Sequence, residues 1–247
     1  MYHRKDVVFT KPSIYVTGIE EYARRVSSAP TEDAAKVAVE TAEKCPQWMD
    51  IASSAIQVKF LSMLVVIKQA RRVLEIGTFT GHATLEIAAS LPDDGTITTI
   101  DNFVADENAR EIAVSAFTSS RYRDKIDLME MDALGALDHV GKSYDLIFID
   151  ADKPNYIAYY EKIVTGGILA RDGILVIDNT LWGGRVLGRQ AGSCDLGESV
   201  NPDEWVENML NDWSKYVVEL NELVVSDPRV ETVLLPVHDG MTLIRYA

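Results

Sequence analysis

The sequence contains little cysteine and no long hydrophobic run. Cys45 and Cys194 are its only two cysteines and lie far apart in the chain. They do not make a disulfide framework, so we expect inert thiols in a reducing cytoplasm. No stretch approaches the roughly 18 uninterrupted apolar residues of a membrane span. The charged start Met1–Asp6 has no apolar run behind it, which argues against a secretory signal.

Positive charge is also in short supply. The chain has 24 Lys and Arg against 38 Asp and Glu, which gives a net charge of −14. A polyanion such as DNA or RNA is then an unfavourable partner. The densest basic stretch, residues 121–125, is short and is more typical of a solvated helix end. The composition therefore predicts no nucleic-acid partner and no membrane partner.

The N-terminal part is expected to form an arm and a cap helix over residues 1–50, within one domain that spans residues 1–247. The first 30 residues are irregular and polar. Thr31 then caps an Ala-rich helix that runs to about Lys44 and ends at Pro46. A second helix follows Ser53. Its apolar residues recur at helical spacing and predict one buried face, made by Ile56, Phe60, Met63, Leu64 and Ile67.

From Arg72 onward, short apolar runs alternate with amphipathic segments, which is typical of β-α-β units around a buried parallel sheet. Right-handed crossovers make such a sheet doubly wound. The expected strands are 73–76, 97–100, 126–129, 146–149 and 174–177, and the helices lie near 82–91, 104–118, 133–140, 155–170 and 203–223. A closing hairpin, 230–235 with 241–246, makes the last strand antiparallel. The sequence predicts an α/β fold with N-terminal helices and a Rossmann-like, seven-stranded, mostly parallel sheet.

A glycine turn follows the first expected strand in the pattern Glu-x-Gly-x-x-x-Gly. Gly77 and Gly81, on either side of Thr78 in this turn, let the backbone approach a ligand. Glu75 lies inside an otherwise apolar strand, where a carboxylate is costly unless it is paired. It could accept hydrogen bonds at the base of a cofactor pocket, face a cation, or bind local backbone amides. The spacing differs from the Gly-x-Gly-x-x-Gly of dinucleotide sites.

Two further acids follow the second and third expected strands. Asp101 ends the second strand, where an acid can bind both hydroxyls of a ribose. It could instead cap the following helix. Asp132, before Ala133, would approach the adenine end of the same ligand or act as a helix cap. We favour the ribose role for Asp101 and leave both roles open for Asp132.

A group of polar residues follows the fourth and fifth expected strands. Asp150, Asp152 and Lys153 come after the fourth strand, and Asp178 and Asn179 after the fifth. Because parallel strands bring their carboxyl ends to one edge, these side chains should converge where ligands bind. Close carboxylates repel each other unless a cation lies between them. Oxygen ligands without Cys or His favour Mg²⁺, with Mn²⁺ or Ca²⁺ as alternatives. Either Asp alone could be only a helix cap.

These motifs resemble those that bind S-adenosylmethionine (SAM) in class I methyltransferases. The chain is most similar to the cation-dependent O-methyltransferases, the group of catechol and caffeoyl-CoA O-methyltransferases, from about Trp48 to the C-terminus. The resemblance implies that Asp150, Asp178 and Asn179 bind the metal, that Lys153 is the base, and that the protein is a homodimer. It implies SAM contacts from Ile51, Ser53, Glu75, Gly77, Thr78, Gly81, Asp101, Ala133 and Asp152.

The chain departs from this family at three positions. Ser53 replaces a more usual threonine but keeps a hydroxyl. Ala83 stands where a serine often contacts the cofactor, so one hydrogen bond is missing. Gly183 stands where plant caffeoyl-CoA enzymes have an asparagine. This last difference argues against caffeoyl-CoA as the acceptor.

The implied reaction is methyl transfer from SAM to one hydroxyl of a vicinal aromatic diol, a small molecule of the catechol type. A phenol has a pKa near 10, so only about 0.1% is ionised at pH 7. Chelation of both hydroxyls by a metal would stabilise the phenolate, and Lys153 would remove the proton. Another bidentate acceptor, such as a hydroxamate, fits the same scheme.

Other functions remain as alternatives. An NAD-dependent oxidoreductase is disfavoured by the glycine spacing and the terminal hairpin. A nucleic-acid methyltransferase is disfavoured by the charge and by the lack of an Asn/Asp-Pro-Pro-aromatic motif. An inactive Ca²⁺-binding or SAM-binding module would not need Lys153. The four histidines are scattered, and none is placed as a base with an acid beside it, which weakens a metal-free mechanism.

Aromatic and glycine-rich segments complete the expected site. Residues 182–197 are rich in glycine and predict a mobile loop beside the metal. Trp182 and Trp48 could stack on a flat ring, although Trp48 could equally pack in the core. The N-terminal arm would cover the site or join a dimer.

Overall fold

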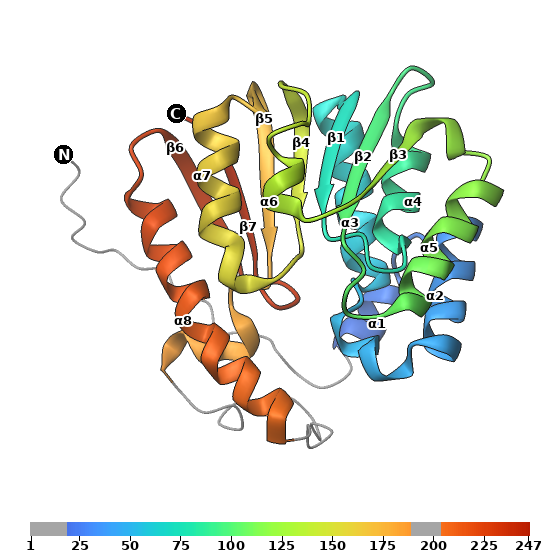
Figure 1. Ribbon diagram of the computed structural model, residues 1–247, viewed down its shortest axis with the longest axis horizontal. Helices are drawn as coiled ribbons and strands as arrows, with labels where there is room; N and C mark the ends of the chain where they lie inside the picture. Colours follow the sequence, from blue (N-terminus) through green and yellow to red (C-terminus); the bar gives the residue numbers. More distant parts are fainter. Residues whose placement is uncertain (1–18, 189–203) are drawn as a thin grey trace.

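Seven strands form one sheet in the computed structural model, which describes residues 19–188 and 204–247 (Figure 1). The strand order is β3-β2-β1-β4-β5-β7-β6. The strands are β1 (Arg72–Ile76), β2 (Thr96–Asp101), β3 (Ile126–Glu130), β4 (Tyr144–Ile149), β5 (Leu169–Asp178), β6 (Val230–Leu235) and β7 (Met241–Tyr246).

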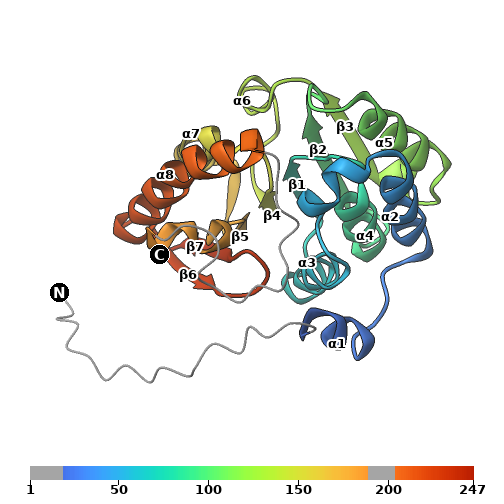
Figure 2. The ribbon, with the colours of Figure 1, turned by 90° about the horizontal axis from the view of Figure 1, so that it is seen from below.

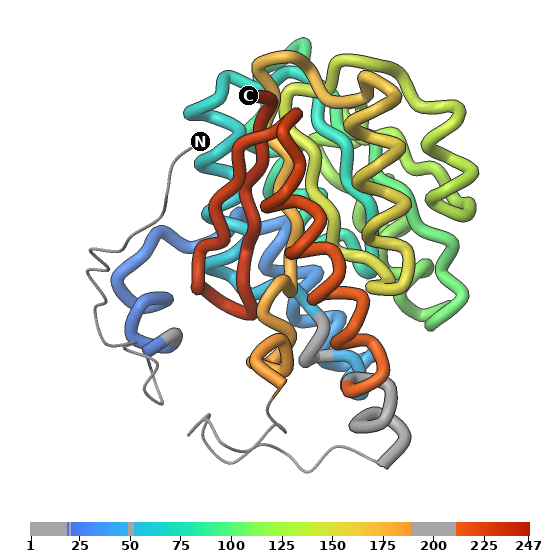
Figure 3. Tube along the Cα trace, turned by 90° about the vertical axis from the view of Figure 1, so that its left-hand side faces the viewer, coloured from blue at the N-terminus to red at the C-terminus, as the bar shows by residue number. Residues whose placement is uncertain are grey.

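The pairing of the strands confirms the predicted sheet. β1 pairs in parallel with β2 and β4, β2 pairs in parallel with β3, and β4 pairs in parallel with β5. β7 is antiparallel to both β5 and β6, and the hairpin forms the edge of the sheet in the side view of Figure 3. The strand order changes direction between β1 and β4. Ligands of open α/β sheets bind at such a switch point.

Helices cover both faces of the sheet (Figure 2). One face packs against α6, α7 and α8, and the other against α3 and α4, with α2 and α5 outside α4. The helices are α1 (Ile19–Arg25), α2 (Glu32–Lys44), α3 (Ala55–Lys68), α4 (His82–Ser90), α5 (Glu107–Ser119), α6 (Ala133–Ala136), α7 (Tyr156–Gly166) and α8 (Glu204–Ser226). Short 3-10 helices are η1 (Pro46–Ile51), η2 (Arg123–Lys125), η3 (Lys153–Asn155) and η4 (Trp182–Leu187). The helix expected over 133–140 is only one turn long.

The N-terminal helices confirm one prediction and correct another. The hydroxyl of Thr31 caps α2 by accepting from the amide of Ala34 at 3.4 Å, and α2 ends before Pro46 as expected. The expectation of an irregular first 30 residues was wrong for α1.

No helix in the described ranges is long and apolar enough to cross a bilayer. Cys45 is a buried free thiol, whereas Cys194 lies outside the described residues.

The predicted buried face of α3 was right for Leu64, which is buried, and for Phe60, which packs against the core, but it was wrong for Met63 and Ile67. Met63 is 56% exposed and Ile67 is 72% exposed, whereas Val58 and Leu61 are fully buried. The helix sequence AIQVKFLSMLVVIK is apolar on nearly every side. Spacing alone therefore could not decide which side faces the sheet, and contact with α4 and the sheet decides it.

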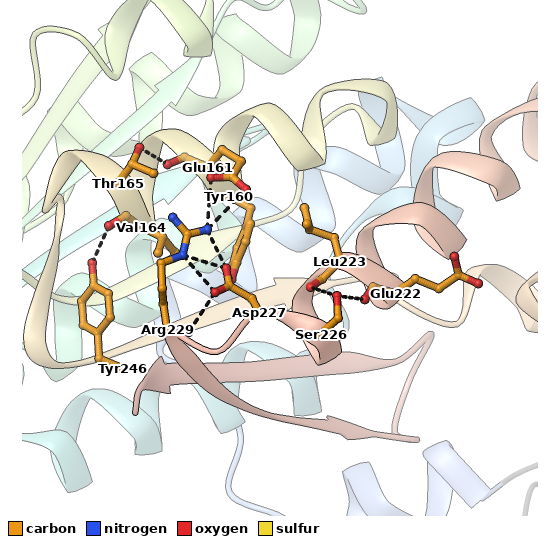
Figure 4. A network of polar contacts seen from close by, with 10 residues as sticks. All are labelled: Tyr160, Glu161, Val164, Thr165, Glu222, Leu223, Ser226, Asp227, Arg229 and Tyr246. Carbon is orange, nitrogen blue, oxygen red and sulfur yellow. Dashed lines mark hydrogen bonds and ion pairs between the residues drawn. The ribbon is translucent and has the colours of Figure 1, made fainter. Parts of the chain in front are cut away.

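A polar network joins α8 to α7 near the edge of the sheet (Figure 4). Asp227 follows α8 and accepts a hydrogen bond from the hydroxyl of Tyr160 at 2.7 Å. Arg229 binds both Asp227 and, at 3.2 Å, Glu161 of α7. The Arg229 guanidinium holds the pKa of Asp227 well below its usual range. This network fixes where β6 begins.

Candidate active site

The glycine turn lies between β1 and α4 at the switch point. Gly77 has φ +100° and its amide donates to the carbonyl of Ile100 at 2.9 Å. A Cβ at Gly77 would overlap the carbonyl of Asp150, and a Cβ at Gly81, with φ +85°, would overlap the ring of Phe117. At Gly77 both the fixed backbone of Asp150 and the positive φ exclude a side chain, whereas at Gly81 the positive φ disfavours one and the Phe117 ring would have to move.

Glu75 is completely buried beneath this turn. The hydroxyls of Thr84 and Thr99 both donate to its Oε2, the second at 2.6 Å. Its partners are therefore side chains, and the interpretation of local backbone amides was wrong. Its Oε1 has no hydrogen-bond partner within the described part of the chain. Burial raises the pKa of Glu75 to about 7. The free oxygen is the atom of Glu75 that remains available to a ligand.

Asp101 joins the end of β2 to the glycine turn. Its Oδ2 accepts from the amides of Thr78 at 3.0 Å and Phe79 at 2.9 Å, and its Oδ1 accepts from the amide of Phe103. The alternative of a helix cap was wrong, because Asp106 caps α5. The carboxylate is held at the ligand-binding edge with lone pairs left over, and its role toward a ribose stays a prediction.

The other proposed SAM contacts surround the same edge. Asp132 caps α6 by accepting from the amide of Gly135 at 2.9 Å, and Ala133 is the first residue of that helix. The carboxylate of Asp152 accepts from the hydroxyl of Tyr159 at 2.6 Å. For Asp132 the capping role is therefore present, whereas a role toward adenine stays a prediction.

Ser53 connects the glycine turn to the acidic residues. Its hydroxyl donates to Oδ2 of Asp150 at 3.3 Å, and its carbonyl lies 3.1 Å from Nδ1 of His82, which begins α4. Ile51 ends η1, but its side chain lies outside the described part of the structure. Ala83 is buried in α4. Burial lowers the pKa of His82.

Lys153 contacts residues from the ends of both β4 and β5. Its Nζ lies 2.7 Å from Oδ1 of Asn179 and 3.5 Å from Oδ1 of Asp150. It also donates to the hydroxyl of Tyr156 at 2.7 Å and to the carbonyl of Ala151 at 2.9 Å. Only 5% of Lys153 is exposed. The predicted convergence of the two strand ends is therefore present.

Asp178 is the most buried acid of this cluster, with 3% exposed. Its Oδ2 accepts from Nε2 of Gln57, and its Oδ1 has no hydrogen-bond partner among the described residues. Burial and then the charge of Asp150 raise the pKa of Asp178 to about 7, against the opposing charge of Lys153. A buried, unpartnered carboxylate oxygen beside a second carboxylate fits a cation.

The donor set consists of oxygen atoms only. Within residues 19–188 and 204–247, no group of three or more His, Cys, Asp or Glu side chains could hold a metal. A metal site here would have two carboxylates, of Asp150 and Asp178, and the amide oxygen of Asn179 would be its third protein ligand; these ligands stay a prediction. Such a set suits hard cations such as Mg²⁺.

Two tryptophans have different surroundings. The ring of Trp182 stacks on Trp213 of α8 at 6.2 Å between centroids, and Nζ of Lys153 lies 5.3 Å from the Trp182 ring centre. Trp48 instead donates from Nε1 to Asp106 at 3.0 Å and packs against the core cluster of α2 and α5. Of these two tryptophans, Trp182 therefore lies beside the candidate catalytic residues and Trp48 does not.

Sequence reasoning missed several residues of the site. Gln57 had a readable signal, because Ser54 and Gln57 form a capping box at the start of α3. Tyr156 and Asp239 had none, since their roles depend on contacts with Lys153 and Asn179. The expected mobile loop over 182–197 is described only as far as Gly188, and the rest lies outside the described residues.

A doubly wound sheet with a closing antiparallel hairpin and a cofactor turn after β1 defines the class I methyltransferase fold. Solved structures share it. SAH-bound PaMTH1 of Podospora anserina matches with TM-score 0.82 and 25% identity, covering 93% of this chain and 94% of that one. TomG of Streptomyces achromogenes, involved in tomaymycin synthesis and solved with SAM, matches with TM-score 0.72 and 26% identity, covering 93% and 96%.

The chain belongs to the O-methyltransferase family, whose model matches residues 25–247. A caffeoyl-CoA O-methyltransferase of Eucalyptus globulus is 36% identical over 203 residues, which is 80% of this chain and 76% of that protein. A caffeoyl-CoA O-methyltransferase of Medicago sativa is 33% identical over 249 residues, 98% of this chain and 94% of that one. The protein is therefore a SAM-dependent O-methyltransferase.

Proposed function

We propose that this O-methyltransferase methylates one hydroxyl of a small vicinal aromatic diol and requires a divalent cation. One observation carries the proposal. Around the buried Lys153, oxygen atoms from the ends of β4 and β5 converge, and Oδ1 of Asp178 has no hydrogen-bond partner among the described residues. A diol can offer two adjacent oxygens to a cation at such a site.

Asp150, Asp178 and Asn179 would hold the cation, and Mg²⁺ suits their oxygen atoms best. When bound, such a cation supplies Lewis-acid stabilisation of an ionised hydroxyl. Lowering a phenol pKa by about three units corresponds to roughly 4 kcal/mol. The protein contributes the fixed positions of these three side chains.

Lys153 is placed to receive the proton of the acceptor hydroxyl. Once its amine has given up its own proton, as this transfer requires, it would accept that of the hydroxyl beside the ligand oxygens of Asp150 and Asn179. The ammonium that forms would donate to three acceptors, namely the Ala151 carbonyl, the Tyr156 hydroxyl and the Asn179 amide oxygen. These acceptors stabilise the charged product of the proton transfer and hold it in place.

The glycine turn, Glu75 and Asp101 are proposed to hold SAM at the adjacent ends of β1 and β2. Asp101 would bind the ribose, and the free Oε1 of Glu75 would accept from the cofactor. Holding the methyl group in line with the acceptor oxygen contributes about 7–11 kcal/mol in well-oriented reactions. The packing of the turn against Asp150 makes such alignment possible.

The acceptor would lie against Trp182, whose ring is close to Lys153. The relatives are named caffeoyl-CoA O-methyltransferases. Gly183 here offers no side chain to a CoA ester, so we favour a smaller diol. A hydroxamate is the alternative, because it also presents two oxygens to a cation.

The test is methyl transfer from labelled SAM to catechols, monophenols and hydroxamates, with Mg²⁺ and with EDTA. Transfer to catechols alone, lost in EDTA and restored by added Mg²⁺, is the expected result. Transfer that survives EDTA would overturn the cation requirement. Transfer to hydroxamates but not to catechols would replace the diol with the alternative acceptor.

We also propose that a second copy of the chain covers the exposed side of α3. Met63, Val66 and Ile67 are 56%, 62% and 72% exposed there. The helix contains no acid, and Lys59 and Lys68 are each paired with an acid from another element. Because each chain carries a charge of −14, two copies can approach with least repulsion at an apolar face without free charge.

Light scattering after size exclusion tests this homodimer. The wild type should have the mass of two chains, and Ile67→Glu should have the mass of one. Val104→Glu, at a position 84% exposed beyond β2, is the control and should stay dimeric. A monomeric wild type would overturn the dimer, and a dimeric Ile67→Glu would exclude this face.

A further inference from the structure

The side-chain amide of Asn179 lies between two partners of opposite type. Its Oδ1 accepts from Nζ of Lys153 at 2.7 Å, and its Nδ2 donates to Oδ2 of Asp239 at 3.3 Å. An ammonium can only donate, and a carboxylate accepts. Only one orientation of the amide satisfies both partners, and it turns the oxygen of Asn179 toward Lys153 and Asp150.

Asp239 is fixed from both sides of its carboxylate. It lies in the turn between β6 and β7, and its Oδ1 accepts from the amide of Gly183 at 2.5 Å. Its own carbonyl accepts from the amide of Leu181 at 2.8 Å. A Cβ at the next residue, Gly240, would overlap the backbone of Leu181. The turn is therefore packed directly on the loop that follows Asn179.

We propose that Asp239 is a positioning residue that holds the Asn179 oxygen toward the cation. The inference rests on the proposed function, because it assigns Asp239 a role only if Asn179 is a ligand. Without an acceptor at position 239, only the hydrogen bond from Lys153 would hold the amide in this orientation, and the amide could turn over. Its NH₂ group would then face the cation, where a donor repels positive charge. The C-terminal hairpin thus becomes part of the active site.

Asp239→Asn is the informative substitution, because it keeps the shape of the side chain. If the side-chain oxygen of the new asparagine at position 239 keeps the short contact with the Gly183 amide, the NH₂ group of that asparagine faces Nδ2 of Asn179. Two donors cannot bond to each other, so the Asn179 amide should turn over. We expect Mn²⁺ affinity, measured by electron paramagnetic resonance of free Mn²⁺, to fall about 10–100-fold, the range for partners that orient metal ligands.

The double variant Asn179→Asp/Asp239→Asn separates positioning from a role in the turn. A carboxylate at position 179 can accept from the amide at 239 and still offer an oxygen to Lys153 and Mn²⁺. We expect Mn²⁺ affinity to return to within about threefold of the wild type. Asp145→Asn is the matched control, because Asp145 also accepts backbone amides, of Arg71 and Arg72, but at the opposite end of the sheet.

Affinity for S-adenosylhomocysteine (SAH) and the unfolding midpoint are measured for every variant. The inference is supported if Asp239→Asn loses Mn²⁺ affinity and the double variant regains it. SAH affinity of both variants should stay within about threefold of the wild type. Wild-type Mn²⁺ affinity in Asp239→Asn would overturn it. If Mn²⁺ affinity falls in Asp239→Asn and does not return in the double variant, Asp239 only stabilises the turn and the inference fails. Absence of Mn²⁺ binding by the wild type would instead overturn the proposed function.

Discussion

The backbone of Gly77 lies against the carbonyl group of Asp150, so closely that a Cβ would overlap it. The amide of Asp150 also donates to the carbonyl of Ile76 at 2.9 Å. The cofactor turn after β1 and the acidic cluster after β4 are therefore packed as one unit. Their neighbouring positions follow from the switch point between these strands.

Gly77→Ala should disrupt this unit. The methyl group meets fixed backbone, so either the turn or the Asp150 segment must shift, and we expect SAH affinity to fall at least about tenfold with a destabilisation of several kcal/mol. Gly167→Ala is the control, since Gly167 also has positive φ but nothing within 4 Å of its Cβ position. This control should lower the free energy of unfolding by about 1 kcal/mol and leave SAH binding unchanged. Equal effects of both variants would contradict the close packing.

Asp178→Ala and Asp101→Ala should separate the two halves of the site. Loss of Asp178 would remove a proposed cation ligand, so Mg²⁺-dependent turnover should fall more than about a hundredfold while SAH affinity changes little. Loss of Asp101 removes the acceptor of the Thr78 and Phe79 amides, and SAH affinity should fall about 10–100-fold. Calorimetry with SAH and initial rates check both. The reverse pattern would show that the two sites are exchanged.

Lys153→Met should impair chemistry more than binding. Loss of the proposed proton acceptor predicts a fall in kcat of about 10²–10⁴. Mn²⁺ affinity should stay the same or rise, because the ammonium lies 3.5 Å from Asp150 and repels a cation. The variant is checked by measuring kcat, Mn²⁺ affinity and the unfolding midpoint. A variant with normal kcat would exclude Lys153 as the base.

Asp227→Asn should reduce stability in a pH-dependent way. Because the pKa of Asp227 is below its usual range, the ionised form stabilises the fold at pH above about 4, and that stabilisation is lost as pH falls through the lower folded-state pKa. At pH 7 we expect the free energy of unfolding to fall by about 1–3 kcal/mol, with Tm falling by roughly 2–4 °C for each kcal/mol.

The difference in Tm between the wild type and Asp227→Asn should therefore shrink as the pH is lowered below about 4. Asp94→Asn is the control. Asp94 pairs with Arg71, but the two side chains are 65% and 60% exposed, and exposed pairs contribute little. A Tm difference that does not vary between pH 7 and pH 3 would contradict the role of the Asp227 charge.

Much of the site could be read from the sequence because it depends on strand ends. Gly77 and Gly81 lie in the turn after β1 and Asp101 ends β2, so the turn geometry they need is local. Asp150 and Asn179 are far apart in the chain, yet parallel neighbours bring their carboxyl ends together whatever the connecting helices contain. Their meeting at Lys153 needed no further information.

The tertiary structure alone decided how those side chains are held. Gln57 reaches Asp178, and Asp239 reaches Asn179, across long separations in the sequence. The buried side of α3 was equally undetermined, because its apolar residues surround the helix. The sequence by itself determined which residues end the strands and hence the chemistry available there. Packing determined which atoms face each other, because a hydrogen bond between distant segments forms only after the sheet and its helices have come together.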